Sequence, residues 1–551
     1  MKKSDINNKV KYIVLQSLIF LFVATGCTKD EFFELKSPPN TGWESVRDME
    51  YGITSVYRQF VNKNEDGIWF LDPFIHYGMS DIVREIGQNG GWSTDAIVRR
   101  ETDQRLSKVD HLGMGYKTIL YSNNMLDFIE TDPFPDATEV DKEMNINRIK
   151  GEALFLRAMA YYHLLTWYAP AYDINSANDS RILPLRLNAP KTIGLALNNA
   201  PVETQLVYDQ VVEDLRTAKG LLPLKYKSGM HPAYEFGRAN KHAAMAALAR
   251  VLILMGRYDE ALVELNGVLD DPELSRALET DPEDVWLNNS TTPTNNGEVI
   301  WYGYYADIEA AQSMKIHEIR IWGYFINSIY QDPSQTKNWW IWGINRGTLL
   351  RCGMLNEDNT VPHSWTYDKR NILFNRFHGY NPKMNEGLAR SQQRVDSLYG
   401  KAFAPFVGFD DPVFISSKYY RVPAIADLGS EPPQNIPIMR SAELYLWRAA
   451  LKQVTGKGGQ ADDLNIIRER SWDTAGGAYV PLSDGETTWD VIDQEWVKEM
   501  SFEGDRIIWL QMFKKPIGPG DRIGVDPVYP PYEGMNWLVP LGETDFYPTG
   551  D

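Results

Sequence analysis

Cysteine and an excess of positive charge are what this chain most clearly lacks. Its 551 residues include only two cysteines, Cys27 and Cys352, which excludes a disulfide framework, a four-cysteine zinc site and an iron–sulfur cluster. Acidic side chains outnumber basic ones by 74 to 56, which gives a net charge of −18. Proteins bind nucleic acid chiefly through an excess of lysine and arginine, so we expect no nucleic-acid partner.

Recognisable catalytic motifs are also missing. The eight histidines form no metal-ligand pattern, and there is no Walker A loop, dinucleotide fingerprint or Gly-x-Ser-x-Gly elbow. A glycosidase-like pair of carboxylates stays open as an alternative, because such a pair is recognised by the distance between its two carboxyl groups, which the sequence does not give. We expect no enzymatic activity and no cofactor. So acidic a chain is compatible with a structural calcium ion, but the sequence assigns it no site.

The apolar content is sufficient for a large folded body. Hydrophobic residues make up 43% of the chain and charged residues 24%, which is far from the composition of disordered proteins. Beyond the N-terminal segment, no apolar run reaches the roughly 20 residues that a bilayer span requires. The sequence therefore predicts a globular chain.

The N-terminus has the form of a lipoprotein signal peptide. Four lysines precede or flank the start of the apolar residues 12–23, a run too short to span a bilayer. Small residues at 24–26 then lead into Cys27, an order that resembles the lipobox of bacterial lipoproteins. The resemblance implies a signal peptide over 1–26, lipidation of Cys27 and a flexible tether over 27–42. An ordinary cleaved signal with an incidental cysteine is the alternative.

The residues after Cys27 bear on location. Lys29 is followed by Asp30 and Glu31, which resembles the surface-export signal of Bacteroidetes lipoproteins. We therefore expect a protein that is anchored to the outer membrane by lipid and faces the cell exterior. Cys352 is then a lone thiol in an oxidising compartment, so we expect it to be buried and inert.

Helical periodicity dominates the sequence from about residue 43 onward. Residues 148–167 carry apolar and aromatic side chains around most of the helical circumference, which predicts a central, buried helix. Further helices are predicted over 202–222 and 241–255, ended by Pro223 and Gly256. An earlier amphipathic helix has one apolar face, formed by Met49, Ile53, Val56 and Phe60.

Two segments look like tetratricopeptide helix pairs. Within 244–272, a turn at Gly256 separates an alanine-rich helix from a second helix, and residues 442–451 and 462–470 form a comparable pair around a glycine-rich turn. No strict period of about 34 residues runs through the chain. We therefore predict a mainly α fold, in which tetratricopeptide-like helix pairs form a scaffold with long loop-rich insertions and a few short strands.

We expect residues 43–551 to form a single body with three parts. Residues 43–272 form a helical N-terminal half, and residues 438–551 contain C-terminal helices and a tail. Between them, residues 273–437 are rich in loops and aromatic side chains, with a short strand predicted at 298–302. Loops of this length inside a folded body are usually functional, so we place the ligand region here.

Tryptophan is concentrated in that region. Trp339 and Trp340 are adjacent, so on an extended strand they point to opposite faces and at least one faces solvent or a ligand. A sugar ring has an apolar face of C–H groups, and an aromatic platform with polar neighbours is suited to bind it. For any single tryptophan, packing beneath a loop is the alternative. Between residues 301 and 342 the tryptophans are Trp301, Trp322, Trp339, Trp340 and Trp342.

A second candidate is the polar loop 88–93, which carries Asn89 and Trp92. Gly90 and Gly91 in this loop would let the backbone approach a ligand closely. A loop with Trp92 turned back onto the body is the alternative. The complete set of candidate ligand-binding residues is Trp92, Asn89, Trp322, Trp339, Trp340 and Trp342.

Several segments carry motifs in a fixed order. Residues 116–129 include Asn124, and residues 151–167 include Glu152, Arg157 and Tyr161. Later motifs are found at 207–223, 237–244, 436–445, at Asn465, Arg468 and Arg470, and at Glu499 with 502–506. Together these segments resemble the SusD/RagB family of surface lipoproteins, which capture nutrients for an outer-membrane transporter. In that family the motif helices are structural, which implies that their Glu, Arg and Tyr residues are buried network partners and not a binding site.

The resemblance also implies a function and partners. It indicates a non-catalytic, surface-anchored protein that binds a nutrient, here a glycan, and delivers oligosaccharide to a SusC-like TonB-dependent transporter. The 88–93 loop resembles the one that supplies an aromatic platform in starch-binding members. The alternative is a peptide-binding RagB-like protein, or a scaffolding helical-repeat protein whose aromatic loops contact the transporter.

Overall fold

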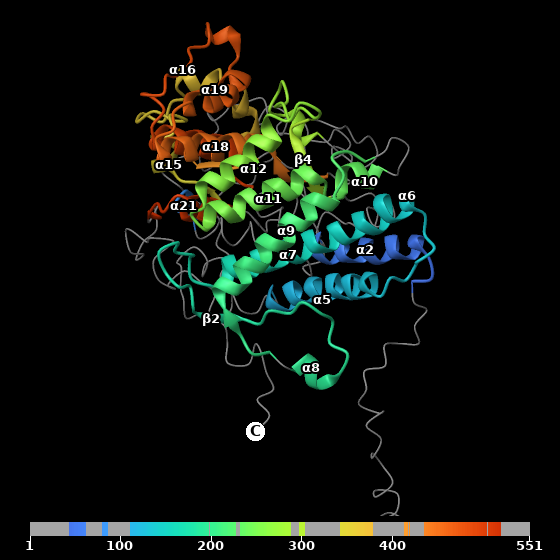
Figure 1. Ribbon diagram of the computed structural model, residues 1–551. Helices are drawn as coiled ribbons and strands as arrows, with labels where there is room; N and C mark the ends of the chain where they lie inside the picture. The colour runs from blue at the N-terminus through green and yellow to red at the C-terminus, as the bar shows by residue number, and fades with distance from the viewer. Residues whose placement is uncertain are drawn as a thin grey trace, which may run out of the picture.

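The helices form one continuous stack, as Figure 1 shows. The computed structural model describes residues 43–61, 80–85, 111–197, 199–226, 232–287, 297–303, 342–377, 413–416, 418, 435–503 and 505–518. The predicted mainly helical fold is confirmed. In the stack each helix packs against the next, in the order α2 (Val46–Val61), α5 (His111–Glu130), α7 (Arg148–Tyr168), α9 (Thr204–Leu221), α11 (Lys241–Leu254), α12 (Tyr258–Leu269), α18 (Ser441–Thr455) and α19 (Gln460–Ser471).

Helix α7 is the buried centre of the N-terminal half, as predicted. Except for Lys150, all of its residues are buried, because α5 and α9 flank it and α2 also contacts it. The helix ends at Tyr168, two residues before Pro170, whose ring cannot continue the hydrogen-bond ladder. The predicted apolar face of α2 is also confirmed, because its four residues Met49, Ile53, Val56 and Phe60 are all buried.

Helices α11 and α12 form the first predicted helix pair. The Asn240 side chain caps α11 by accepting a hydrogen bond from the Ala243 amide at 2.9 Å. Five buried alanines on α11 have little side-chain volume and let neighbouring helices approach closely. Between the helices, Gly256 has a φ of +72°, a left-handed conformation that glycine adopts without steric cost.

Helices α18 and α19 form the second predicted pair. Their connection contains Gly456, Gly458 and Gly459, whose φ angles of +67°, +75° and +79° explain why the turn is rich in glycine. Acidic side chains lie in the first turn of α19 and arginines in its last turn, which complements the helix dipole. Helix α20 (Trp489–Met500) packs on α18, and α21 (Arg506–Met512) on α11.

The strands are few and short. β4 (Val299–Gly303) is antiparallel to β8 (Ile436–Arg440), which leads directly into α18, and all residues of both strands are buried. β2 (Arg181–Leu183) pairs with β3 (Val202–Glu203). The four-stranded sheet has the order β1 (Val83–Glu85), β5 (Trp342–Ile344), β7 (Val413–Ser416) and β6 (Phe374–Phe377). Each neighbouring pair in it is antiparallel.

Short helices connect the larger elements. Cys352, just after one of them, is buried as predicted, and burial raises the pKa of its thiol to about 11. Within the described residues, no helix has both the length and the apolar character that crossing a membrane requires. The short helices are α6 (Glu139–Asp141), the π-helical turn η3 (Lys142–Asn147), α8 (Ile193–Leu197), α10 (Pro232–Gly237), α15 (Arg346–Arg351) and α16 (His363–Thr366).

Candidate functional site

The four-stranded sheet brings together two segments that the sequence analysis singled out. Strands β1 and β5 are antiparallel, and their register places Glu85 opposite Trp342. The 88–93 loop follows β1 within a few residues, and Trp342 is the last member of the tryptophan-rich region 301–342. The two candidate ligand segments therefore start from neighbouring strands at the same end of one sheet. We call this end, defined by Glu85 and Trp342, the sheet end.

Most of the predicted ligand residues lie outside the described residues. Trp342 is on β5, where its backbone pairs with Glu85. The other candidate residues, Trp92, Asn89, Trp322, Trp339 and Trp340, are outside that part of the chain, as is the predicted lipidation site Cys27.

Trp301 belongs to the core and is not available to a ligand. Its side chain is fully buried on β4, its Nε1 donates to the Gly237 carbonyl oxygen at 3.1 Å, and its ring packs against Phe60 and Phe155. For Trp301, the alternative that the side chain packs within the body and does not face a ligand is therefore correct. The number of tryptophans in a segment does not show whether the strand that carries them is buried. β4 is buried on both faces, so Trp301 faces the core.

The N-terminal end of β1 is held in place by Arg506, a residue of the 502–506 motif. Arg506 Nε and Nη2 donate to the two carboxylate oxygens of Asp81 at 2.8 and 2.9 Å. Arg506 also contacts Asp493 on α20, which accepts from Arg351 at 2.7 Å and from the Trp509 indole at 2.8 Å. The start of β1 is thus tied to α20 and α21 by paired charges, in which Arg506 and Asp493 are buried, Asp81 is partly buried and Arg351 is exposed.

The electrostatics of this arrangement favour ionised carboxylates. Burial by itself raises the pKa of Asp81 and Asp493, but the charges of Arg506 and Arg351, together with the hydrogen bonds that these carboxylates accept, hold both pKa values below their usual range. Asn345, directly after β5, adds two neutral contacts. Its amide donates to the Ile82 carbonyl oxygen at 2.9 Å and its side chain to that of Asp81 at 2.9 Å. These contacts hold β1 and β5 in register.

A second buried network surrounds Arg440 at the end of β8. Arg440 Nη1 donates to Glu298 at 2.8 Å and to Glu499 at 2.6 Å, while Nη2 donates to Glu503 at 2.7 Å. Arg470 on α19 also contacts Glu298 and Glu499. The charges of this network are paired with one another, as buried charges must be. These motif residues are therefore structural.

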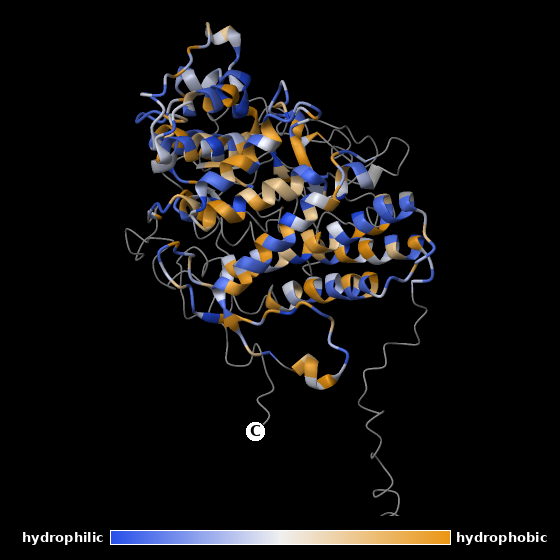
Figure 2. Cartoon of the chain, in the orientation of Figure 1, coloured by the Kyte–Doolittle hydropathy of each residue, from blue (hydrophilic) through white to orange (hydrophobic). Residues whose placement is uncertain are grey.

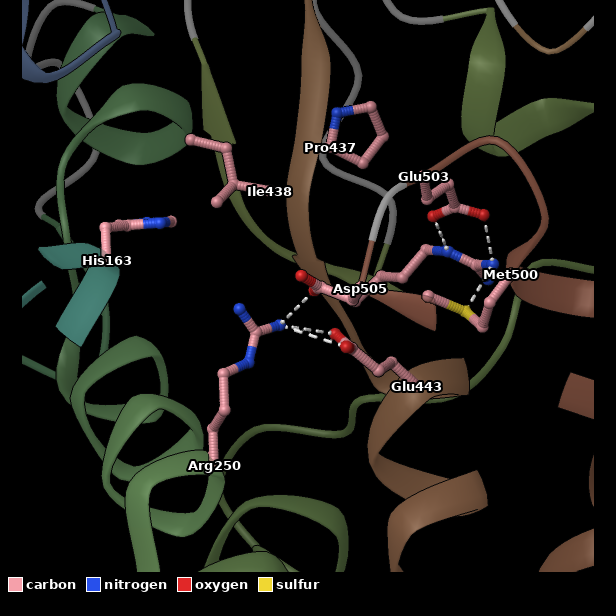
Figure 3. Close-up of a pocket in the computed structure, with 9 residues that line it drawn as sticks. His163, Arg250, Pro437, Ile438, Glu443, Met500, Glu503 and Asp505 are labelled. Carbon is pink, nitrogen blue, oxygen red and sulfur yellow. Dashed lines mark hydrogen bonds and ion pairs between the residues drawn. The ribbon is translucent and has the colours of Figure 1, made fainter. Parts of the chain in front are cut away.

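A small cavity lies beside the Arg440 network, with Arg440 and Glu503 in its lining together with His163 of helix α7 (Figure 3). Arg250 Nη2 lies 3.0 Å from both carboxylate oxygens of Glu443 and 3.3 Å from Asp505. Burial, reinforced by the neighbouring acids, raises the pKa of Glu443 to about 8 and also raises that of Asp505. His163 lines the opposite side, and its pKa is lowered to about 3, first by burial and then by Arg250.

The size of this cavity limits what it can hold. Its volume of about 20 Å³ is sufficient for a single water molecule, whereas ligand pockets typically measure hundreds of Å³. A glycan therefore does not fit there. Although Glu443 has a raised pKa of the kind found in catalytic acids, it is enclosed and bound to Arg250.

The motif residues of α5 and α7 form a third network, with one difference from the sequence analysis. As expected, Glu152, Arg157 and Tyr161 are buried and hydrogen-bonded. Asn124, however, is exposed, and its neighbour Asn123 is buried. Asn123 Oδ1 accepts from Arg157 Nη1 at 2.8 Å. The asparagine that joins this network is therefore Asn123 and not the motif residue Asn124, and one residue on a helix is a rotation of about 100°.

Across the described ranges, no group of three or more His, Cys, Asp or Glu side chains is arranged to hold a metal ion.

Two family profiles match the chain. One, described as "Starch-binding associating with outer membrane", matches residues 31–253, and the profile of the SusD family matches residues 420–510. The "SusD-like protein P2" of Formosa agariphila is 24% identical over 433 residues, which cover 73% of this chain and 72% of that protein.

Solved structures share the fold. A SusD superfamily protein from Bacteroides vulgatus superposes with a TM-score of 0.65 at 18% identity, covering 91% of this chain and 96% of the other. A SusD-like carbohydrate binding protein from the same species superposes with a TM-score of 0.62 at 17% identity, with the same coverage of both chains. At these identities the likeness establishes the fold.

Proposed function

The chain belongs to the SusD/RagB family, and we propose that it is a non-catalytic protein of the outer cell surface that binds a glycan through the sheet end. The observation that carries the proposal is the pairing of Glu85 with Trp342, because this register starts both candidate ligand segments from one place. The family description, starch-binding and outer-membrane-associated, and the carbohydrate-binding relative from Bacteroides vulgatus support a glycan as the ligand.

The ligand contacts in this proposal are aromatic stacking and hydrogen bonding. Trp340 lies two residues from Trp342, and Trp92 lies seven residues from Glu85. A fully extended chain of seven residues reaches at most about 25 Å. Both rings are therefore within reach of the sheet end. Trp92, Trp322, Trp339, Trp340 and Trp342 supply the platform for the C–H faces of sugar rings, and Asn89 supplies an amide for the hydroxyl groups.

Binding without turnover is part of the proposal, and the surroundings of two buried acids support it. Glu443 and Asp505, whose pKa values are raised, are enclosed with Arg250 in a cavity that does not admit a sugar. Purified protein is expected to leave oligosaccharides intact. Saturable production of shorter sugars, abolished by one carboxylate substitution, would overturn this part of the proposal.

Surface attachment and delivery complete the proposed function. Cys27 carries the lipid, and the bound oligosaccharide passes to a SusC-like TonB-dependent transporter. Cys27→Ala is expected to release soluble protein or to stall processing. Unchanged detergent partitioning and surface exposure of that variant would contradict the anchor.

Calorimetry against a panel of polysaccharides tests the binding site. Trp92→Ala and Trp340→Ala are each expected to weaken binding tenfold or more, which corresponds to about 1–3 kcal/mol for an aromatic anchor, without lowering the melting temperature. Tyr51→Ala is the matched control, because Tyr51 is an aromatic residue exposed on α2, away from the sheet. Normal binding by both tryptophan variants would refute the site. A response to peptides and to no glycan would instead favour the peptide-binding alternative.

A further inference from the structure

The segment between β2 and β3 exposes a concentration of apolar side chains. Eleven large apolar residues are exposed within the described part of the chain, and four of them lie between residues 187 and 197. Leu195 is 57% exposed and Leu197 is 50% exposed, both on the short helix α8. In Figure 2, α8 is an orange element set apart from the helical stack. Exposed apolar clusters of this kind usually mark a contact surface.

The start of this segment is held firmly by the buried network of α5 and α7. Tyr161 Oη accepts from the Arg186 amide at 2.6 Å and lies 3.0 Å from its carbonyl oxygen, which also accepts from Asn123 Nδ2 at 3.0 Å. Arg157 Nη1 donates to the Leu187 carbonyl oxygen at 3.1 Å. The polar residues of the family motifs therefore position the backbone that leads to α8.

Two further contacts hold α8 and the residues before it. The Arg186 guanidinium donates to the Ala196 carbonyl oxygen at 2.8 Å, so Arg186 connects the start of the segment to α8 itself. On α5, the carboxylate of Asp127 accepts from the Asn188 side chain and from the Ala189 amide, each at 2.9 Å. The apolar side chains of α8 are thus exposed on a segment that is itself well anchored.

The charge of the segment is opposite to that of the whole protein. Residues 180–202 contain Arg181, Arg186 and Lys191 and no acidic residue, in a chain with a net charge of −18. Arg181 pairs with Glu203 and Arg186 is used within the segment, but Lys191 is exposed immediately before α8. Asp127 is an acid in contact with the segment, and its carboxylate accepts from Asn188 and the Ala189 amide. An exposed apolar helix with an exposed lysine beside it is suited to an anionic lipid surface.

We propose that α8 is a membrane-contact element, in which Ile193, Leu195 and Leu197 enter the interfacial region of an anionic bilayer and Lys191 lies at its head groups. A stable protein interface buries about 800 Å² on each partner, far more than one five-residue helix presents. Interfacial lipid binding scales with the apolar area that leaves water, so three exposed apolar side chains give a weak contact of their own, which the acyl chain proposed at Cys27 would strengthen in the cell. The proposal is independent of glycan binding.

Vesicle flotation tests the proposal. The protein is the mature form from residue 27 with Cys27→Ala, which contains every described residue and carries no acyl chain. It is expected to float with vesicles of phosphatidylglycerol and phosphatidylcholine. The double variant Leu195→Glu/Leu197→Glu is expected to lower the partition coefficient by about tenfold or more, because two apolar side chains no longer leave water. Lys191→Glu is expected to weaken binding to these vesicles but not to phosphatidylcholine alone.

Val263→Glu is the matched control, because Val263 is 67% exposed on α12 and outside the segment. It is expected to partition like the parent protein. Absence of flotation by the parent, or equal partitioning of the double variant, would refute the lipid contact. In cells, a photo-crosslinker in place of Leu195 is expected to label lipid, and labelling of a protein band instead would also refute it. Glycan affinity of the double variant is expected to be unchanged, so this test and that of the glycan site fail separately.

Discussion

Arg506 and Asp81 form a two-point ion pair although 425 positions separate them in the sequence. The pair joins the N-terminal end of α21 to the residues just before β1. Because β1 leads into the 88–93 loop, a residue of a C-terminal family motif determines where that candidate ligand loop begins.

Replacing Arg506 tests this relationship. Arg506→Gln leaves the buried carboxylates of Asp81 and Asp493 without their main partner, so the free energy of unfolding is expected to fall by about 3–5 kcal/mol. Arg181→Gln is the control, because the Arg181–Glu203 pair is exposed and contributes less than about 1 kcal/mol. Urea denaturation measures both variants. A loss for Arg506→Gln no greater than that of the control would contradict the structural role of the pair.

A pH titration of stability tests the Arg250 cavity. The folded-state pKa of Glu443, about 8, lies above the ordinary glutamate value of 4.5, so the folded protein holds a proton that the unfolded chain releases. This contribution is complete below about pH 4.5 and is lost as the pH rises to about 8, with a slope of at most about 1.4 kcal/mol per unit. Urea midpoints at pH 5, 7 and 9 measure it.

Glu443→Gln is expected to flatten the fall in stability between pH 5 and pH 8. Glu357→Gln is the control, because the Glu357 side chain is 85% exposed, and it is expected to retain the slope of the parent protein. An unchanged slope in Glu443→Gln would show that the proton is held elsewhere.

The neighbouring residues Asn123 and Asn124 form a second matched comparison. Asn123→Ala removes hydrogen bonds to Arg157 and to the Arg186 carbonyl oxygen in a buried site, and a loss of about 1–3 kcal/mol is expected. Asn124→Ala changes an exposed helical position, and an effect within about 0.5 kcal/mol is expected. Thermal or urea unfolding separates the two, and equal effects would argue against the network.

Thiol labelling tests the burial of Cys352. In the mature form with Cys27→Ala, Cys352 is the sole cysteine. Its burial and raised pKa predict that a disulfide reagent at pH 8 reacts at least about tenfold more slowly with folded protein than with protein in urea. Equal rates in the two conditions would mean that the thiol is accessible.

Local patterns predicted the helical scaffold well. The apolar face of α2 and the glycine turn between α18 and α19 were readable because each depends on residues a few positions apart. The pattern of α5 does not show which of Asn123 and Asn124 is buried, because both lie in one polar run, 122–124, and a helix buried on several sides shows little periodicity.

The candidate site depends on contacts that no local pattern encodes. The tryptophan count identified a region, but it could not show that Trp301 lies in a buried strand. The pairing of Glu85 with Trp342 joins segments far apart in the sequence. Arg506 pairs with Asp81, and the sequence does not show which of the 74 acidic residues is its partner. These pairings depend on which residues the folded chain buries, because only a charge removed from water requires a specific partner.

The long sequence distance between Asp81 and Arg506 also sets an order of events during biogenesis. Until residue 506 has been synthesised and exported, Asp81 has no guanidinium partner and β1 has no fixed base. The strand that pairs with β1 arrives at residues 342–344, still well before that point. The start of β1 is therefore fixed late, after the N-terminal helices have been able to pack. Chains interrupted before Arg506 would lack the ion pair that holds the start of this strand.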